Sequence, residues 1–120
     1  MSTISLHSCA VLVLFAALTG CATKPQPLYS WNGYSDHVYS YLKHDASPEA
    51  QVLSMEEGIQ KANAAQRMLP PGYYAHLGLM YMNAGRTDQA LSAWEHEKRS
   101  FPESAPYIDY LINNMKKNKS

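Results

Sequence analysis

Prolines mark the limits of the helices that the sequence predicts between residues 35 and 120. Pro48 follows a capping serine and precedes a glutamate, which is typical of a helix start, whereas Pro70 ends the helix that follows. Pro102 stops a later helix, and Pro106 lies in the first turn of the last one. Apolar residues between these prolines recur three and four positions apart, and the alternating patterns typical of strands are absent. The sequence therefore predicts an all-α domain.

Each expected helix has a stripe of apolar side chains to bury. Ser35 is expected to cap the first helix, and the second would run from Pro48 to about Met68. Gly58 is a weak point in the second helix, because glycine within a helix costs roughly 1 kcal/mol relative to alanine. The third and fourth helices would meet at a turn that contains Gly85. The expected stripes comprise Val38, Tyr41 and Leu42 in the first helix, Val52, Met55, Ile59, Ala62 and Met68 in the second, and Ile108, Leu111, Ile112 and Met115 in the last.

The amino-terminal residues have the pattern of an export signal. Residues 11–18 form a compact apolar run, which is shorter than the roughly 20 residues of a membrane-spanning helix. Residues 18–21 (Leu-Thr-Gly-Cys) resemble the lipobox of bacterial lipoproteins, which implies cleavage before Cys21 and attachment of lipid to its thiol. An ordinary secretory signal is the alternative interpretation. We expect residues 1–20 to be a signal peptide and residues 21–34 to be a tether.

The mature chain would carry one cysteine and no net charge. Cys9 would be lost with the signal, so Cys21 could form no intramolecular disulfide. Ala22 rather than Asp follows the cysteine, which is similar to lipoproteins sorted to the outer membrane. Ten basic and ten acidic side chains cancel, whereas nucleic-acid binders are strongly basic. These features favour a protein anchored to the outer membrane and facing the periplasm, with the covalent lipid as its only expected cofactor.

Residues 71–104 match the spacing of a helical repeat of 34 residues. Small residues stand where two antiparallel helices would approach each other, and aromatic residues stand on either side. The residues that define this register are Tyr74, Leu77, Gly78, Tyr81, Gly85, Ala90, Trp94 and Pro102. The segment therefore resembles a tetratricopeptide repeat, although Glu97 occupies a position where the repeat has alanine. Residues 34–70 resemble a degenerate, longer repeat, and residues 105–117 would be a capping helix.

The resemblance to that repeat implies a binding groove. The inner helix of such repeats lines a concave surface that accepts an extended peptide or a partner helix. The corresponding residues of this chain are Ala75, Leu79, Met82 and Asn83. As a whole, the chain is similar to uncharacterised families of small bacterial lipoproteins, some of which are encoded beside lipoproteins that resemble the curli secretion channel. That second resemblance implies a role in envelope assembly and supplies no catalytic activity.

No group of polar residues in the sequence predicts catalysis or metal binding. The mature histidines lack a carboxylate-rich metal pattern, and we interpret them as partly exposed or capping residues. They are His37, His44, His76 and His96. Residues 95–97 (Glu-His-Glu) point in different directions on a helix and indicate a solvated face. The chain has neither a Gly-x-Ser-x-Gly turn nor a phosphate-binding glycine loop, so we do not expect an enzyme.

The aromatic residues indicate a function more directly. Tyr107 and Tyr110 are expected to pack within the capping helix, whereas four aromatic residues have no expected packing role. These four are Tyr29, Trp31, Tyr39 and Tyr73. Because Tyr and Trp favour protein interfaces, the sequence predicts a non-catalytic interaction module. It would be anchored through Cys21, bind another envelope protein or lipoprotein, and assist assembly or export of an envelope complex. The alternative is a structural accessory subunit of a multi-lipoprotein complex or a homodimer.

Overall fold

The computed structural model describes residues 24–117, which form five α-helices and one short 3-10 helix. The elements are α2 (Tyr34–Lys43), α3 (Pro48–Ala64), α4 (Tyr73–Asn83), α5 (Thr87–Ser100), η1 (Pro102–Ser104) and α6 (Ala105–Lys117). No strand occurs within residues 24–117, where the β pairing is an isolated bridge between Tyr29 and Met68. The prediction of an all-α domain is therefore confirmed. The predicted signal peptide and Cys21 lie outside the described residues.

Helix α2 begins at Tyr34, and the residue that precedes it is not a side-chain cap. Gly33 stands at that position with φ 75° and ψ 16°, a left-handed conformation that glycine adopts without steric cost. Ser35 lies inside the helix, so the prediction that it caps α2 is wrong. Leu42 was expected to be buried in α2, and its side chain is instead 69% exposed. The helix ends at His44, where φ is 58°.

Helix α3 starts as expected and ends earlier than expected. The Ser47 hydroxyl accepts a hydrogen bond from the Ala50 amide at 3.2 Å, which satisfies one of the free amides of the first turn. The helix ends at Ala64 because Gln66 adopts a left-handed φ of 52° and turns the chain. Met68 lies beyond that turn and is 54% exposed, so the prediction that it is buried in the stripe is wrong.

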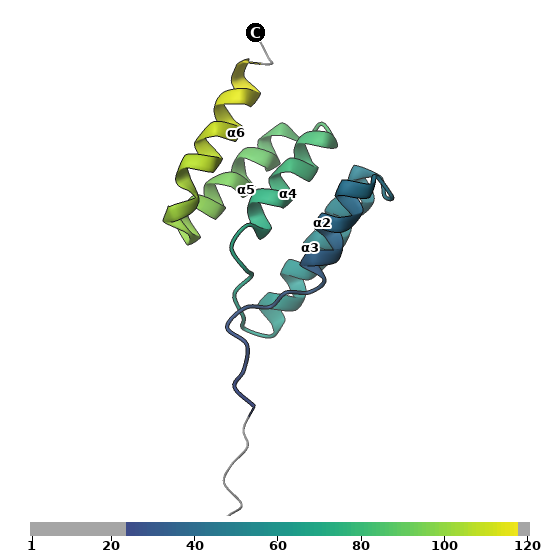
Figure 1. Ribbon diagram of the computed structural model, residues 1–120, viewed down its shortest axis with the longest axis vertical. Helices are drawn as coiled ribbons and strands as arrows, with labels where there is room; N and C mark the ends of the chain where they lie inside the picture. Colours follow the sequence, from purple (N-terminus) through teal and green to yellow (C-terminus); the bar gives the residue numbers. More distant parts are fainter. Residues whose placement is uncertain (1–23, 118–120) are drawn as a thin grey trace, which may run out of the picture.

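The helices pack in the order in which they follow one another along the chain. Helix α2 lies against α3, α3 against α4, α4 against α5, and α5 against α6 (Figure 1). The most extensive contact is between α4 and α5, which are joined by a short turn that contains Gly85. Gly85 has φ 73°, in the left-handed region that favours glycine. Helix α4 is thus in the middle, with α2 and α3 on one side and α5 and α6 on the other.

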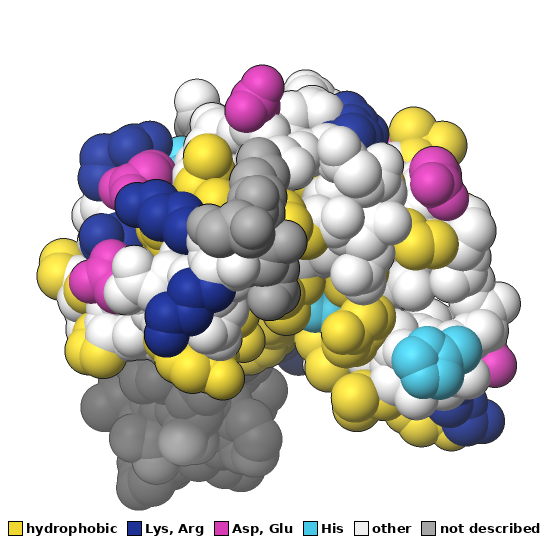
Figure 2. Space-filling model, turned by 90° about the horizontal axis from the view of Figure 1, so that it is seen from above, with side chains coloured by type: hydrophobic (Ala, Val, Ile, Leu, Met, Phe, Trp, Pro, Cys, Tyr) yellow, Lys and Arg dark blue, Asp and Glu magenta, His cyan; other side chains and the backbone are white. Residues whose placement is uncertain are grey.

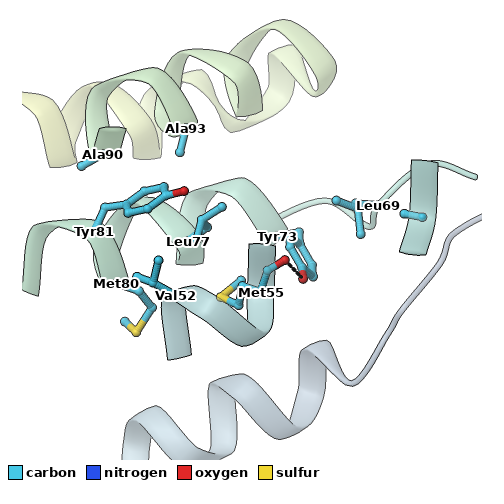
Figure 3. Close-up of a cluster of buried hydrophobic side chains, with 10 residues drawn as sticks. Val52, Met55, Leu69, Tyr73, Leu77, Met80, Tyr81, Ala90 and Ala93 are labelled. Atoms are coloured by element: carbon cyan, nitrogen blue, oxygen red, sulfur yellow. Dashed lines mark hydrogen bonds between the residues drawn. The ribbon is translucent and has the colours of Figure 1, made fainter. Parts of the chain in front are cut away.

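A first core cluster fills the space between α3 and the α4–α5 hairpin. Tyr73 is completely buried in it, and its hydroxyl donates a hydrogen bond to the Met55 carbonyl at 2.8 Å (Figure 3). The ring lies on Gly58, where a Cβ would be 2.2 Å from the Tyr73 hydroxyl oxygen. Gly58 is therefore the point of close approach between α3 and α4. The buried residues of this cluster are Val52, Met55, Ala62, Leu69, Tyr73, Leu77, Met80, Tyr81, Ala90 and Ala93.

A second core cluster joins α4, α5 and α6. Its buried residues are Ala75, Trp94, Ile108 and Met115. The Trp94 ring lies on Gly78, where a Cβ would be 2.2 Å from the indole nitrogen. That nitrogen donates a hydrogen bond to the Ala75 carbonyl at 3.1 Å. Tyr107 and Tyr110 were expected to pack within α6, but they are 51% and 62% exposed and do not belong to the core.

Candidate functional site

Aromatic side chains from α2, α4 and α6, together with Trp31 just before α2, gather on one side of the molecule. Figure 2 shows the described surface hollowed between the part formed by α6 and the part formed by α2, with hydrophobic side chains and a histidine in the hollow. We call the following set the aromatic face: Trp31, Tyr34, Tyr41, His76 and Tyr107. Trp31 and Tyr107 are the most accessible members, with 53% and 51% of their surface exposed.

Tyr34 is the centre of the aromatic face. Its ring stacks on Trp31, with centroids 6.3 Å apart and planes 28° apart, and it meets the edge of His76 at 6.1 Å. The Tyr34 hydroxyl lies over Gly72, where a Cβ would be 2.8 Å away and where φ is 90°. Only glycine suits this position, because an added side chain would both strain the backbone and displace Tyr34. The first residue of α2 is therefore seated on the N-terminus of α4.

Groups of α5 and α6 act on the Tyr34 hydroxyl. Burial raises the pKa of the Tyr34 hydroxyl, and the neighbouring Glu97 carboxylate and Tyr107 hydroxyl raise it further. Tyr107 belongs to α6, so the aromatic face extends from α2 across the start of α4 to α6. The raised pKa keeps the Tyr34 phenol uncharged at neutral pH. The face therefore offers aromatic area with hydroxyl groups and no formal charge, which suits a partner that brings apolar or aromatic side chains.

His76 lies beneath the aromatic face and is nearly inaccessible. Its surface is 7% exposed, and no described group forms a hydrogen bond with its Nε2 atom. The ring meets Tyr41 edge-on, with centroids 5.4 Å apart. Burial lowers the pKa of His76 and the neighbouring His37 ring lowers it further, against a smaller opposing effect of the His37 backbone, so the imidazole is neutral at pH 7. The interpretation of His76 as a partly exposed or capping residue is wrong.

Glu97 is completely buried and caps the N-terminus of α4. One carboxylate oxygen accepts hydrogen bonds from the Gly72 amide at 2.6 Å and from the Ser104 hydroxyl at 3.3 Å. The other oxygen accepts a hydrogen bond from the Ala75 amide at 3.3 Å. Gly72 has no side chain that could do this, so a residue of α5 supplies the acceptors that α4 lacks. The prediction that residues 95–97 form a solvated face is wrong for Glu97.

The four residues expected to line a groove on α4 differ in accessibility. Ala75 is 5% exposed and belongs to the second core cluster, so it offers no surface to a partner. Leu79 and Met82 are half-buried, and both pack against that cluster. Asn83, the last residue of α4, is exposed. Three of the four residues therefore lie in or against the second core cluster, whereas Trp31 and Tyr107, the most accessible members of the aromatic face, lie outside α4.

A second hollow region lies between α3 and α5, and the Tyr74–His96 ring pair divides it. The two ring centroids are 3.9 Å apart, and burial together with Arg99 lowers the pKa of His96. One hollow, of about 190 Å³, is lined by Ile59, Tyr74, Leu77, Tyr81, Gln89, Ser92, Ala93 and His96. The other, of about 230 Å³, is lined by Asn63, Arg67, Met68, Leu69, Tyr74, His96, Ser100 and Phe101. Both are open and smaller than the sites that enclose most small ligands.

The described residues offer neither a metal site nor a membrane span. Residues 24–117 contain no group of three or more His, Cys, Asp or Glu side chains that could hold a metal ion. In the same part of the chain, every helix is too short or too polar to cross a bilayer.

Sequence reasoning missed the two residues that organise this region. Tyr34 belongs to the predicted tether of residues 21–34, whereas in the structure it is the first residue of α2. In the sequence Glu97 is a departure from the repeat pattern, whereas in the structure it is buried and hydrogen-bonded to the start of α4. An acidic residue at a position reserved for alanine was the signal that could have identified it, because a buried carboxylate requires hydrogen-bond donors.

A comparison with known proteins gives the family. The model for a domain of unknown function, DUF4810, matches residues 28–111, which extend from the tether into α6 and include all of the aromatic face. Neither the curated proteins nor the solved structures contain a match. With this model covering more than half of its length, the chain belongs to the DUF4810 family.

Proposed function

We propose that the chain is a non-catalytic protein–protein interaction module, anchored through lipid on Cys21 to the periplasmic face of the outer membrane. It binds another envelope protein or lipoprotein and assists assembly or export of an envelope complex. The accessible aromatic face carries this proposal, because exposed Trp and Tyr side chains on a preformed surface are characteristic of binding sites. The lipobox-like residues 18–21 support the anchor. A structural accessory subunit of a multi-lipoprotein complex, or a homodimer, is the alternative.

We further propose that α4 and α5 are a repeat of the tetratricopeptide type, with α2 and α3 as a degenerate repeat before it and α6 as the cap. One contact, one buried residue and one backbone conformation support this assignment. Trp94 lies directly on Gly78, Ala90 is completely buried, and Gly85 adopts the left-handed turn conformation between the helices. In this arrangement α2, α4 and α6 are the inner helices, which are the helices that supply the aromatic face.

In-cell cross-linking of the full chain tests the function. The variant Trp31→Ala/Tyr107→Ala removes the two most accessible members of the aromatic face. Tyr39→Ala is the matched control, because Tyr39 is 57% exposed and lies on α2 away from Tyr34, five residues along the helix. We expect a discrete envelope partner that cross-links to wild type and to Tyr39→Ala and is lost in the double variant.

Two other results would decide against the interaction module. Cross-links to copies of the same chain alone would favour the homodimeric accessory subunit. A partner retained by the Trp31→Ala/Tyr107→Ala variant would place the interface elsewhere and overturn the role of the aromatic face. Circular dichroism melts of all variants establish that each one is folded, which we expect because both substituted side chains lie on the surface.

A further inference from the structure

A second accessible surface lies where the tether crosses the loop between α3 and α4. We call it the tether face and define it by the residues that line a shared hollow there. They are Gln26, Pro27 and Leu28 from the tether, and Ala65, Gln66, Arg67 and Met68 from the loop. Leu28 is 71% exposed and Met68 is 54% exposed. Two large apolar side chains from separate parts of the chain are therefore exposed to solvent on one surface.

Backbone and side-chain contacts hold the two parts of the tether face together. The Ser30 amide donates a hydrogen bond to the Met68 carbonyl at 2.7 Å, within the isolated bridge between Tyr29 and Met68. The Tyr29 ring packs edge-on against buried Phe101, with centroids 6.2 Å apart. The Arg67 guanidinium donates a hydrogen bond to the Gln26 side-chain carbonyl. The tether is thus attached to the domain from Gln26 onward and does not hang free of it.

Covalent geometry brings the tether face close to the predicted lipid. Gln26 is five positions after Cys21, and a fully extended residue spans at most about 3.6 Å, so the two lie within about 18 Å of each other. In Figure 1 the described tether leaves the domain at the end opposite the carboxyl end of α6. A lipid on Cys21 therefore sets the tether face, and not the α4–α5 turn or the end of α6, next to the membrane.

The residues that line the tether face include one basic side chain, Arg67, and no acidic one. Residues 21–35 and residues 58–87 contain no Asp or Glu, whereas Lys24 and Arg67 are basic. Apolar side chains next to cations and free of acids are the combination that adsorbs to a bilayer with anionic headgroups. A second copy of this surface would bring like charges together, and a soluble acidic partner would leave Leu28 and Met68 unexplained.

We propose that the tether face lies on the surface of the membrane that carries the Cys21 lipid. Leu28 and Met68 enter the boundary between the headgroups and the acyl chains, and Arg67 pairs with lipid phosphate. This inference rests on the proposed lipid anchor. It adds a fixed orientation, because a domain held by its lipid alone would rotate freely on the tether, whereas this domain has one face on the bilayer.

Site-directed fluorescence on the full lipidated chain tests the orientation. The mature chain has only Cys21, whose thiol is blocked by lipid, so Met68→Cys introduces a single site for an environment-sensitive fluorophore. Leu53→Cys on α3 is the matched control, since Leu53 is 59% exposed and far along α3 from the tether face. In vesicles of phosphatidylethanolamine and phosphatidylglycerol, we expect a blue shift and severalfold weaker quenching by iodide at Met68→Cys and neither change at Leu53→Cys.

Equal iodide quenching at the two sites in anchored protein would overturn the orientation and leave the anchor intact. A wild-type chain whose Cys21 thiol reacts with the fluorophore would show that the lipid is absent. That result would overturn both the proposed lipid anchor and the orientation that rests on it. Protection of Met68→Cys in detergent without vesicles, with dimers in solution, would assign the tether face to a second copy and refute membrane contact. Arg67→Glu should reduce the blue shift of a label at Leu28→Cys, whereas Arg99→Glu on α5 should leave it unchanged.

Discussion

On both sides of α4, an aromatic side chain packs against a glycine of the neighbouring helix. Toward α5, the Trp94 ring lies on Gly78, and toward α3 the Tyr73 ring lies on Gly58. In each contact a Cβ on the glycine would be 2.2 Å from a polar atom of the ring, and that atom donates a hydrogen bond to a helix carbonyl. Both glycines thus allow a large aromatic side chain to approach the backbone of a neighbouring helix while its polar end remains satisfied.

The two contacts differ in how firmly the ring is held. All three nearest atoms to a Cβ on Gly78 belong to the indole of Trp94, at 2.2 to 2.8 Å. A Cβ on Gly58 would meet only the far end of Tyr73 within 3.4 Å, chiefly its hydroxyl. A helix–helix contact centred on a whole ring tolerates no added atom, whereas one centred on a hydroxyl can adjust when that hydroxyl is removed. The contact between α4 and α5 is therefore the stricter of the two.

The largest expected effect is that of Gly78→Leu. The new side chain would occupy the space of the Trp94 indole and break its hydrogen bond to the Ala75 carbonyl. Overpacking of a core costs about 1 to 3 kcal/mol or more, and this substitution also leaves a buried polar group unsatisfied. We expect no cooperative thermal unfolding transition in circular dichroism. A melt like that of wild type would show that α4 and α5 are not in the contact described here.

Glu97→Ala tests whether the repeat pattern or the observed helix cap determines stability at this position. Alanine is the residue that the repeat pattern has at this position, yet the Glu97 carboxylate accepts hydrogen bonds from the Gly72 and Ala75 amides at the start of α4. Loss of a helix cap costs about 1 to 2 kcal/mol, and the buried amides lose their acceptor as well. We expect a lower urea midpoint for Glu97→Ala and a smaller decrease for Glu95→Ala on the exposed side of α5. A stabilised Glu97→Ala variant would favour the pattern over the cap.

Local signals in the sequence were sufficient to predict most of the fold. The capping serine before Pro48, the turn that contains Gly85 and the helix over residues 105–117 depend on a few neighbouring residues, and all three occur in the structure. The early end of α3 was not predictable in this way. Met68 has the spacing of a buried residue, but Gln66 turns the chain before it, and a non-glycine residue gives no advance sign of a positive φ.

The candidate site depended on contacts between distant residues and was harder to predict. Tyr73 had no expected role because its partner Gly58 is 15 positions away in another helix. From the sequence alone, Gly58 indicated only a weak point in that helix. The burial of Ala75 was not predictable for a similar reason, since periodicity does not show that this residue shares a core cluster with Ile108 and Met115 of α6. Periodicity indicates which face of a helix is apolar, but not which helix covers it.

The contact between α3 and α4 is tested by combining two substitutions. Gly58→Ala places a Cβ against the Tyr73 hydroxyl, so we expect a loss of about 1 kcal/mol after the gain in helix propensity is subtracted. Tyr73→Phe removes that hydroxyl and its hydrogen bond to the Met55 carbonyl, at a cost of about 1 kcal/mol. The double variant should lose less unfolding free energy than the two single variants lose together, because without the Tyr73 hydroxyl the new side chain at position 58 meets no clash. Additive losses in urea melts would show that Tyr73 does not lie on Gly58.

The smallest expected effect is a pH dependence confined to the same side of α4. His76 follows Tyr73 by one turn, and burial lowers its pKa from the ordinary 6.5. The unfolded chain therefore takes up this proton at a higher pH than the folded chain does. The stability due to neutral His76 is complete above about pH 6.5 and is lost as the pH falls toward the lower pKa of the folded state.

Burial also lowers the pKa values of His37 and His96, so all three histidines act in the same direction. His76→Gln should reduce the loss of stability in urea melts between about pH 7 and pH 5.5 more than His96→Gln does, because His76 is the more deeply buried. His44→Gln, at an exposed position, is the control. An unchanged pH dependence in His76→Gln would mean that the ring is accessible to water in solution. The aromatic rings of α2 would then not cover α4 as the Tyr34 and Tyr41 contacts indicate.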